Sequence, residues 1–249
     1  MRSVQLTITA ISLAVIANLA IAQEQSSFGV GLALGHRESI YRDMDDKSGA
    51  LPYINYKNGN FFVRGLETGY FFFGDESTLR IGTLARLRAD GYDAGDSDFM
   101  AGMEDRDHTV EGGLIATYPT RFGSFSMAAL ADLAGKHDGY ELALKWFKPI
   151  SLSQSWILSP ELGLSYNSAN LNNYYYGVRA SEATAARAAY EADAGYSYNA
   201  GLSLTYLINQ QHMLILGMTY KGYDSAVTDS SIVDKSSTFN TGLVYSYKF

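Results

Sequence analysis

The sequence predicts an all-β protein, a transmembrane antiparallel β-barrel of about twelve strands with short periplasmic turns and longer extracellular loops. Segments of about ten residues alternate between apolar side chains and small or polar ones, which is the length and pattern of a membrane-crossing strand. The connections between these segments are alternately long and short. The chain also stops on an aromatic residue, Phe249, at the end of such a segment.

The last strand shows the alternation most clearly. Phe239, Thr241, Leu243, Tyr245, Tyr247 and Phe249 share one face, and Asn240, Gly242, Val244, Ser246 and Lys248 share the other. A strand that ends the protein without a tail is what an outer-membrane barrel presents to the barrel-assembly machinery. We therefore expect Tyr245, Tyr247 and Phe249 to form that assembly terminus.

The first 22 residues read as a secretory signal peptide. Arg2 is followed by a mostly apolar run, and Ala20-Ile21-Ala22 is an A-x-A cleavage site, so we expect cleavage near Ala22 and one barrel over residues 23–249. A transmembrane anchor is the alternative, but the run is short and interrupted by polar residues. These features place the protein in the outer membrane of a Gram-negative envelope.

Composition agrees with this prediction and excludes several classes of function. Nineteen Tyr, 12 Phe and 24 Gly against four Pro suit an aromatic-rich β-protein. The chain has no cysteine, which removes disulfides, thiol catalysis and zinc-thiolate sites. A formal net charge of −7 argues against nucleic acid as a partner.

The strands are expected near 28–37, 48–57, 60–66, 68–74, 78–89, 107–118, 122–133, 138–148, 155–167, 195–208, 211–222 and 237–249. The odd-numbered connections are 38–47, the turn at 66–67, 90–106, 134–137, 168–194 and 223–236, and three of these six are long. The even-numbered connections at 57–60, 74–77, 119–121, 149–154 and 209–210 are all short. This rhythm requires periplasmic termini and an even number of strands.

Three places are less regular. Pro160 interrupts its strand, so we expect a bulge or a locally unpaired position there. Residues 60–74 contain continuous apolar runs, which leaves a ten-stranded barrel open, and a soluble β-sandwich is the alternative for the whole chain. In the longest loop, Ser181 and Glu182 precede an alanine-rich stretch, which predicts a short helix ending near Tyr190.

Charged side chains at inward-facing positions are the first candidate site. The candidate lumen charges are Arg80, Arg86, Arg88, Glu111, Glu141, Lys145 and Glu161. Opposite charges are expected to pair, because an unpaired ion in a narrow dry space costs several kcal/mol. Two interpretations stay open: a network that plugs the lumen, or a small pore that selects by charge.

Other sites are weaker. Acidic residues crowd the loops at 43–46 and 90–107, where calcium or magnesium could bridge to lipopolysaccharide, although solvated surface charge is the simpler interpretation. The four histidines show no paired metal-ligand spacing, and no nucleophile elbow is present. We therefore expect no cofactor, no metal and no enzyme activity, with a hydrolase kept as a minor alternative. Outer-membrane lipid and lipopolysaccharide are the expected surroundings.

Short motifs along the whole chain are similar to those of one family. They are Gly29-Val30-Gly31, Leu51-Pro52-Tyr53-Ile54, Asn58-Gly59-Asn60-Phe61-Phe62, Asn173-Tyr174-Tyr175-Tyr176-Gly177-Val178 with Ser181-Glu182-Ala183, and Tyr245-Ser246-Tyr247-Lys248-Phe249. In this order they resemble the MipA/OmpV outer-membrane proteins, also called MltA-interacting proteins. Arg179-Ala180 departs from the family, in which a proline often precedes the acidic residues.

The resemblance implies a scaffold that holds a murein lytic transglycosylase beside a penicillin-binding synthase. Other family members are described as surface antigens, adhesins or porin-like proteins, so a narrow channel and an adhesin are the alternatives. A scaffold would use the periplasmic turns at 118–122 and 149–155, and our candidate contact residues there are Tyr118, Arg121, Pro149 and Gln154. An adhesin would use the long loops instead.

Overall fold

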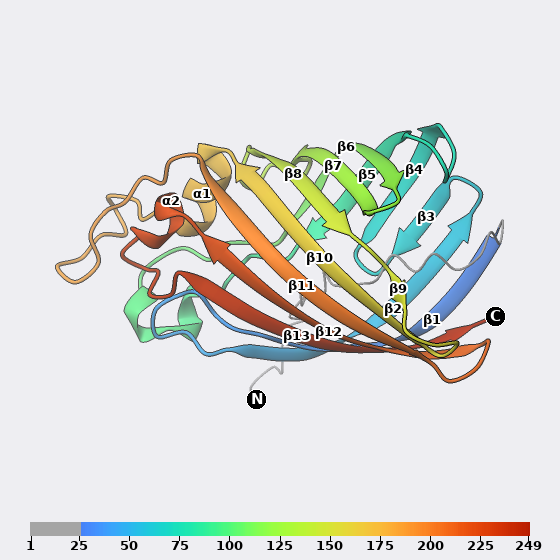
Figure 1. Cartoon of the computed structure of the whole chain (residues 1–249). Coiled ribbons are helices and arrows are strands. Elements are labelled where there is room, and N and C mark those ends of the chain that lie inside the picture. The colour runs from blue at the N-terminus through green and yellow to red at the C-terminus, as the bar shows by residue number, and fades with distance from the viewer. Residues whose placement is uncertain (1–25) are drawn as a thin grey trace.

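The computed structural model describes residues 26–249, which form a closed antiparallel β-barrel (Figure 1). The predicted signal peptide and its cleavage site lie outside the described residues. The strands are β1 Ser26–Arg37, β2 Lys47–Asn58, β3 Phe61–Arg64, β4 Glu67–Phe73, β5 Arg80–Arg88, β6 Thr109–Thr120, β7 Gly123–Asp132, β8 Tyr140–Phe147, β9 Ile150–Ser151, β10 Trp156–Asn167, β11 Gly195–Leu207, β12 His212–Tyr223 and β13 Ser237–Lys248.

The barrel wall has twelve strands, as predicted. Each strand pairs with its neighbours in sequence, and β1 closes the barrel against β13 from Gly29 opposite Lys248 to Arg37 opposite Asn240. The two-residue β9 pairs with β10 and continues the line of β8, so it is not a separate strand of the wall. Residues 60–74 form two short strands, β3 and β4, so the ten-stranded alternative is excluded.

The long connections gather at one end of the barrel, at the left of Figure 1, and the C-terminus lies at the other end. The long loops carry two short 3₁₀ turns, η1 Ala94–Asp96 and η2 Asp98–Met100, and two short helices, α1 Ala169–Tyr176 and α2 Ser225–Thr228. Within residues 26–249, neither helix is long and apolar enough to cross a membrane. The end with the loops is the extracellular end, and the end with the C-terminus is the periplasmic end.

Side chains alternate between the bilayer and the lumen as the sequence predicts. On β8, Tyr140, Leu142 and Leu144 are exposed on the outer wall, while Glu141 is buried inside. On β11 the exposed set contains Tyr196, Tyr198 and Leu202, and the buried set contains Ser197, Ser203 and Thr205. Period-two alternation therefore separates a lipid face from an interior face.

Pro160 does not create a bulge. It lies opposite Leu202 of β11 in a continuous register. On its other side the ladder is interrupted, because β8 ends at Phe147 and β9 begins at Ile150, with Pro149 between them. The register resumes unchanged across this gap, so the strand has no bulge. The Pro160 carbonyl still accepts a hydrogen bond from Lys148 N at 3.2 Å, and only the donor that Pro160 lacks is missing on this side. Pro160 N lacks a hydrogen, and the interruption in the ladder accommodates it.

The helix predicted from Ser181 is also wrong in its position. The longest loop does contain one helix, but α1 covers Ala169–Tyr176, with the Ser168 hydroxyl accepting a hydrogen bond from Leu171 N. Residues 181–190 form turns instead. Glu182 and Arg187 make tertiary contacts that a helix would break, and these contacts outweigh the helix propensity of the alanines.

Candidate functional site

A cluster of ionised side chains occupies the barrel interior just below the extracellular loops. We define the interior charge cluster as Arg86, Arg88, Asp90, Glu111 and Glu141. Arg86 Nε lies 2.8 Å from one Glu111 oxygen, and Arg88 Nε lies 2.7 Å from the other. Arg86 also lies 2.9 Å from Glu141, which Arg88 contacts as well. The two arginines are therefore held between two carboxylates.

The strand registers explain this arrangement. Arg86 is directly opposite Glu111 in the ladder between β5 and β6, and Arg88 lies two residues further along the same face of β5. Glu141 projects inward from β8, so its carboxylate meets the guanidinium groups across the interior. Glu111 is 0% exposed. Burying these ions costs several kcal/mol each, and mutual pairing offsets that cost.

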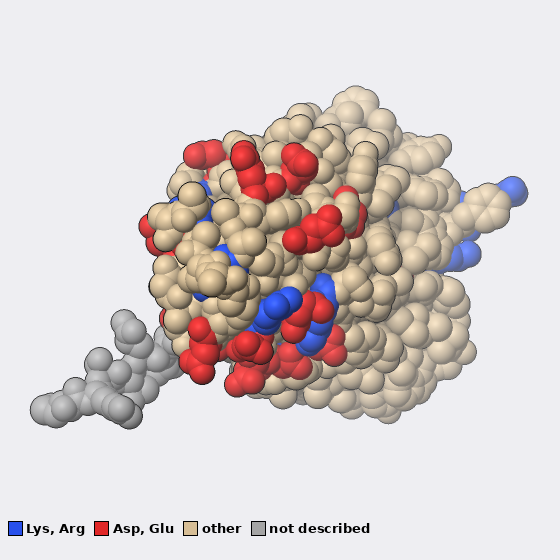
Figure 2. All heavy atoms as spheres, turned by 90° about the vertical axis from the view of Figure 1, so that its left-hand side faces the viewer, with Lys and Arg blue, Asp and Glu red and all other residues tan. Residues whose placement is uncertain are grey.

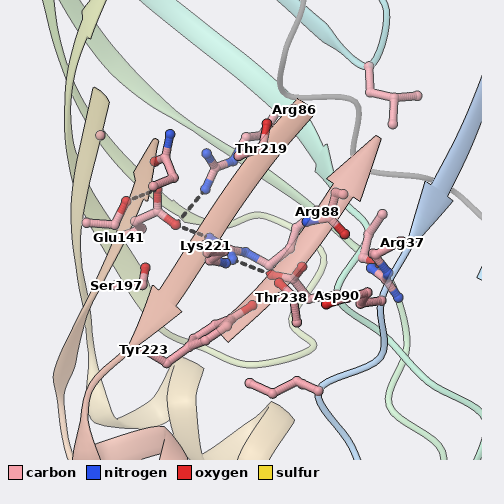
Figure 3. A pocket seen from close by; sticks show the side chains of 18 of the residues that line it. Arg37, Arg86, Arg88, Asp90, Glu141, Ser197, Thr219, Lys221, Tyr223 and Thr238 are labelled. Atoms are coloured by element: carbon pink, nitrogen blue, oxygen red, sulfur yellow. Dashed lines mark hydrogen bonds and ion pairs between the residues drawn. The ribbon is translucent and has the colours of Figure 1, made fainter. Parts of the chain in front are cut away.

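Asp90 extends the cluster into the loop that follows β5. Its carboxylate accepts a hydrogen bond from Arg88 Nη1 at 2.7 Å. Burial raises the pKa of Asp90, but Lys221, Arg88 and Arg37 lower it by more, so the pKa lies well below its usual range. Asp90 is therefore ionised at all physiological pH values. Figure 3 shows Arg86, Arg88, Glu141 and Asp90 converging, with Arg37 and Lys221 beside them.

His137 joins the cluster to the loops above it. Its Nδ1 accepts a hydrogen bond from the Gly139 backbone N–H at 3.0 Å, which places the proton of the neutral ring on Nε2. Nε2 lies 3.2 Å from Glu111 Oε1. The ring also packs against Tyr174 and Tyr175 of α1, with centroid distances of 6.4 and 6.1 Å. His137 thus connects the barrel wall with the helix that covers it.

The other candidate lumen charges lie in two separate places. Lys145 Nζ is 3.2 Å from Glu161, so β8 and β10 carry a second interior ion pair. Arg80 is remote from both pairs, with its guanidinium 4.0 Å from the centroid of the Phe71 ring and 3.7 Å from Glu76. Arg80 and Arg86 share a face of β5 but are six residues apart, which is about 20 Å along a strand. The three arginines therefore do not form one ladder.

A cavity of about 290 Å³ adjoins the interior charge cluster. Its wall includes the two ion-pair systems together with polar residues of the strands on the far side. The charged and small polar residues of the lining are Arg37, Glu38, Ser39, Asp45, Lys47, Arg64, Glu67, Arg86, Arg88, Asp90, Glu141, Lys145, Glu161, Ser165, Ser197, Asn199, Thr219, Lys221, Thr238 and Asn240. A volume of this size holds a small polar solute or several waters.

The extracellular loops pack into an apolar cluster that covers this cavity. We define the loop cap as the buried side chains Ile40, Tyr41, Met44, Tyr92, Ala94, Met100, Met103, Leu171, Tyr175, Tyr176, Val178, Val227, Ile232 and Val233. They come from four different loops, and the rings of Tyr41 and Tyr92 lie 4.6 Å apart. Burial raises the pKa of Tyr92 to about 12 and also raises the pKa of Tyr41 well above its usual value. The loop cap is a small hydrophobic core in its own right.

Buried polar contacts fix the position of the longest loop. Arg106 and Glu182 form an ion pair of 3.0 Å with both side chains almost fully buried. Glu182 also accepts hydrogen bonds from the backbone N–H groups of Glu104 at 3.1 Å and Arg179 at 3.0 Å. Arg187 donates to the carbonyl oxygens of Phe99, Ala101 and Glu182. The two longest loops are thereby joined.

The outer surface of the loops is acidic (Figure 2). The loops 38–46, 89–108, 133–139, 168–194 and 224–236 carry 18 acidic and six basic residues. Several carboxylates already have partners, because Asp96 pairs with Lys47 at 2.7 Å, Asp107 pairs with Lys136 at 2.5 Å and Asp105 accepts from Ala94 N. Among residues 26–249, no group of three potential ligands is arranged for a metal ion.

The predicted periplasmic contact residues lie on the opposite end of the barrel. Tyr118 is exposed on β6, and the Arg121 guanidinium lies 4.5 Å from the Phe122 ring centroid in the turn before β7. Pro149 separates β8 from β9, and Gln154 lies exposed in the turn before β10. The structure therefore brings the two turns to the same end, since the strands before and after each turn are neighbours in the barrel wall.

The C-terminal residues, which we expect to be recognised during assembly, lie at the seam where the barrel closes. Phe249 N donates to the Phe28 carbonyl at 2.9 Å, and the two rings stack at 5.3 Å. The Tyr247 ring lies 4.9 Å from that of Phe249, and Tyr245 is exposed on the outer wall. Phe249 itself is 68% exposed. An aromatic end group on the outer surface suits the headgroup level of the bilayer.

Sequence reasoning missed several residues of this site. The sequence pattern places Asp90 among the acidic residues of its loop and gives His137 no paired ligand, and it does not distinguish Arg37 or Lys221 from other charged residues. Arg187 lies in an alanine-rich stretch that predicted a helix. A charged residue at the end of a row of inward-facing positions on a strand is the pattern that could have identified Asp90, Arg37 and Lys221. The contacts of Arg106, Glu182 and Arg187 join loops far apart in sequence, and no spacing rule predicts them.

The fold and the interior site define an outer-membrane β-barrel whose lumen is occupied by an ion-pair network and covered by packed loops. Residues 30–249 match the model of the family described as MltA-interacting protein MipA, and the chain belongs to this family. Outer membrane protein OmpV of Vibrio cholerae is 32% identical over 84% of this chain and 82% of that protein. The MltA-interacting protein of Escherichia coli K12 is 28% identical over 98% and 99%.

Solved structures share the fold. A crystal structure of an outer-membrane channel from Pseudomonas putida F1 aligns with 94% of this chain and 100% of its own chain, with a TM-score of 0.50 and 13% sequence identity. The relatives named as outer-membrane proteins, together with this fold, place the protein in the outer membrane.

Proposed function

We propose that this protein is a scaffold in the outer membrane that binds a murein lytic transglycosylase and a penicillin-binding synthase through its periplasmic turns. The name of the Escherichia coli relative, which matches almost from end to end, supports the first partner. The observation that carries the proposal is the occupied interior. A lumen that holds an ion-pair network beneath a packed loop cap suits a binding role better than free diffusion.

The turn that contains Arg121 offers the sharper contact surface. Arg121 and Phe122 project at the tip, with the guanidinium against the ring, and Trp146 Nε1 donates to the Phe122 carbonyl at 3.2 Å. An arginine and aromatic rings on a rigid turn have the composition of an interface hot spot. The second turn, with Gln154, is polar and places its hydrogen-bonding groups near the same edge.

Capture of the enzymes from a cell-envelope extract tests the scaffold. The refolded barrel is immobilised in detergent, and Arg121→Ala with Phe122→Ala is compared with wild type. We expect at least a tenfold loss of retained transglycosylase, because hot-spot truncations cost about 2 kcal/mol or more. Asn209→Ala with Gln210→Ala, in another periplasmic turn, is the matched control. Equal capture by all three proteins would contradict the assigned turns, and no capture by wild type would contradict the scaffold.

A narrow channel is the second candidate, and the interior cavity is the observation that favours it. Lys145 faces this cavity and is not part of the interior charge cluster, so Lys145→Glu changes the local charge without breaking that cluster. In planar bilayers we expect a conducting channel to shift its preference toward cations in this variant. Silent bilayers with wild type would exclude the channel.

A further inference from the structure

The extracellular loops form a second cavity, which is separate from the one inside the barrel. It has a volume of about 670 Å³ and lies between the 133–139 loop, the helix α1 and the 177–191 segment that follows α1 at the left of Figure 1. Ligand sites in proteins range from about 300 to 1,000 Å³. We call this cavity the loop cleft and define it by six exposed polar residues of its lining: Lys136, Asp138, Asn170, Asn173, Arg179 and Glu191.

Backbone contacts hold both walls of the loop cleft in place. Val178 and Tyr190 exchange two backbone hydrogen bonds of 2.8 and 2.9 Å, so the two ends of the 178–190 segment are tied together. On the other wall, the Asp132 carboxylate accepts hydrogen bonds from backbone N–H groups of the 134–138 turn. Because these contacts lie within the protein, the cleft exists before a ligand arrives, and binding costs less conformational entropy.

Each of the two asparagines has one end of its amide held by the backbone. Asn173 Oδ1 accepts a hydrogen bond from Ala192 N at 3.1 Å, which leaves its NH₂ group as a donor. Asn170 Nδ2 donates to the Asp138 carbonyl oxygen at 3.1 Å, which leaves Asn170 Oδ1 as an acceptor. The lining thus holds donors and acceptors at set positions. A hydroxyl group, which donates and accepts at once, matches such a mixed lining.

The charges of the lining argue against a strongly charged ligand. Each of its three basic residues has an acidic partner outside the lining: Arg106 pairs with Glu182, Lys136 with Asp107, and Arg179 with Glu104. The two acidic residues of the lining, Asp138 and Glu191, have no ion-pair partner among residues 26–249. A cation would therefore meet three positive side chains, and an anion would meet two unpaired carboxylates. A neutral ligand meets neither obstacle, and its donors can bind the two carboxylates.

Two tyrosine rings supply most of the apolar surface of the loop cleft. Tyr174 Oη accepts a hydrogen bond from Asp107 N at 2.9 Å, and Tyr190 Oη donates to the Ala226 carbonyl oxygen at 3.1 Å. These contacts fix the rings, which are partly exposed. Aliphatic side chains are scarce, because the lining contains only the buried Val178 besides two alanines. The cleft therefore offers little to the apolar side chains that anchor a peptide.

We propose that the loop cleft binds a neutral saccharide at the cell surface. A sugar ring combines the two features that the cleft matches. Its hydroxyl groups donate to Asp138 and Glu191 and accept from Asn173, and its C–H face packs on an aromatic ring. The site lies at the extracellular end of the barrel and is independent of the scaffold function, which we assign to the periplasmic turns.

A glycan array tests the proposal with the refolded barrel in detergent. The array holds neutral oligosaccharides of bacterial surface polysaccharides, neutral oligosaccharides of animal glycoproteins, and sialylated, sulfated and amino-sugar glycans. We expect saturable binding to neutral oligosaccharides and weaker binding to the charged ones. The neutral set that binds identifies the source, which is either the bacterial envelope or another cell. Binding to charged glycans that is as strong as to neutral ones, or no binding to any glycan, would overturn the proposal.

Asp138→Asn with Glu191→Gln removes both unpaired carboxylates and keeps the size of the side chains. We expect the affinity for the neutral oligosaccharide that wild type binds to fall about tenfold, because hydrogen bonds to ionised acceptors are the stronger ones. Asp229→Asn with Asp234→Asn makes the same change of charge at exposed positions of the last extracellular loop, outside the cleft, and should bind like wild type. Equal losses in the two double variants would assign the effect to the charge of the loop surface and contradict the site.

Ala180→Trp tests the position of the site without removing a polar group, because the large ring fills the cleft. Binding should be lost in this variant, whereas Ala183→Trp, exposed in the same loop but outside the lining, should bind normally. Fast migration of unheated samples in an SDS gel shows that both variants are folded. Full binding by folded Ala180→Trp would place the saccharide elsewhere and overturn the proposal.

Discussion

Arg88 is the residue on which the interior charge cluster depends most. It contacts Glu111, Glu141 and Asp90 at once, and it lies where β5 ends and the loop begins. A sequence can place an arginine on the inner face of a strand, but its three partners come from three different elements. The stabilisation is therefore a property of the closed barrel.

Arg88→Met tests this dependence. Removing one partner from a buried ion pair leaves uncompensated charge and costs about 3–5 kcal/mol. We expect a corresponding fall in the free energy of unfolding, measured by urea titration of the refolded barrel with tryptophan fluorescence. Arg80→Met is the matched control, because its ion pair with Glu76 is more exposed and worth about 1 kcal/mol or less. Equal losses in the two variants would contradict the special role of Arg88.

Glu182 makes the stability of the 168–194 loop depend on pH. Burial raises the pKa of Glu182, but hydrogen bonds from the backbone N–H groups of Glu104 and Arg179 and from Arg106 lower it below its usual value of 4.5. Because the folded protein lowers this pKa, its stabilisation is fully present above pH 4.5 and is lost as the pH falls through the folded value.

We therefore expect the 168–194 loop to become sensitive to an acid-active protease below about pH 4.5, as measured by the rate of cleavage in intact proteoliposomes. Glu182→Gln should be cleaved faster than wild type at neutral pH and should show a smaller change with pH. Glu191→Gln, an exposed change in the same loop, is the control. A pH profile that is identical in wild type and Glu182→Gln would assign the effect to another group.

At the scale of elements, the closing seam between β1 and β13 leaves no room for a side chain at Gly31. A Cβ atom at Gly31 would lie 1.8 Å from the Tyr245 carbonyl oxygen, whereas a Cβ at Gly201 on β11 would meet its nearest atom, Glu161 Cβ, at 3.5 Å. The first distance requires the backbone to move, and the second is an ordinary van der Waals contact. The seam at Gly31 is therefore much less tolerant of a larger residue than the wall at Gly201.

Gly31→Ala should lower the temperature at which the folded barrel loses its fast migration in an SDS gel, because the clash separates the seam. A fall of several degrees corresponds to about 1–3 kcal/mol of overpacking strain. Gly201→Ala is expected to migrate like wild type, since its new methyl group occupies free space. If both variants unfold at the same temperature, the seam accommodates the methyl group by a local shift.

At the scale of the whole molecule, the strands were predictable and the loops were not. Side-chain alternation reports a local property, so β8 and β11 could be assigned from their own residues. Pro160 predicted an interruption in the pairing of its strand, but the sequence did not show that the interruption would lie between β8 and β9, next to Pro149. The helix expected at Ser181 failed because Glu182 and Arg187 are held by partners in a loop about 80 residues earlier.

The site shows the same division. The inward positions of Arg86, Glu111 and Glu141 follow from strand phase. Arg80 lies apart from these residues because it is six positions from Arg86 along β5. The alternation of side chains shows which face a residue is on, but not how far along the strand it lies. The short length of β3 could not be predicted from alternation, because a strand of four residues carries too few positions to show where it ends. Which inward charges meet is therefore decided by the closed barrel and not by any single strand.

Assembly of the barrel in the membrane is a property of the complete chain, and Phe249 connects it to a single residue. The Phe249 ring is largely exposed, so it adds little to the packing of the folded barrel beyond its stack on Phe28. We therefore expect Phe249→Ala to change the free energy of unfolding in detergent by only about 1 kcal/mol.

In cells, the same variant should accumulate less folded barrel in the outer membrane if the assembly machinery reads the terminal aromatic residue. Quantitative immunoblotting of outer-membrane fractions, with heated and unheated samples to separate folded from unfolded protein, gives the yield. Phe239→Ala, on the same face of the strand near its other end, removes another exposed phenylalanine side chain and is the control. Equal yields for the two variants would assign no special role to the terminus, and equal losses of stability in detergent would assign the effect of Phe249 to folding.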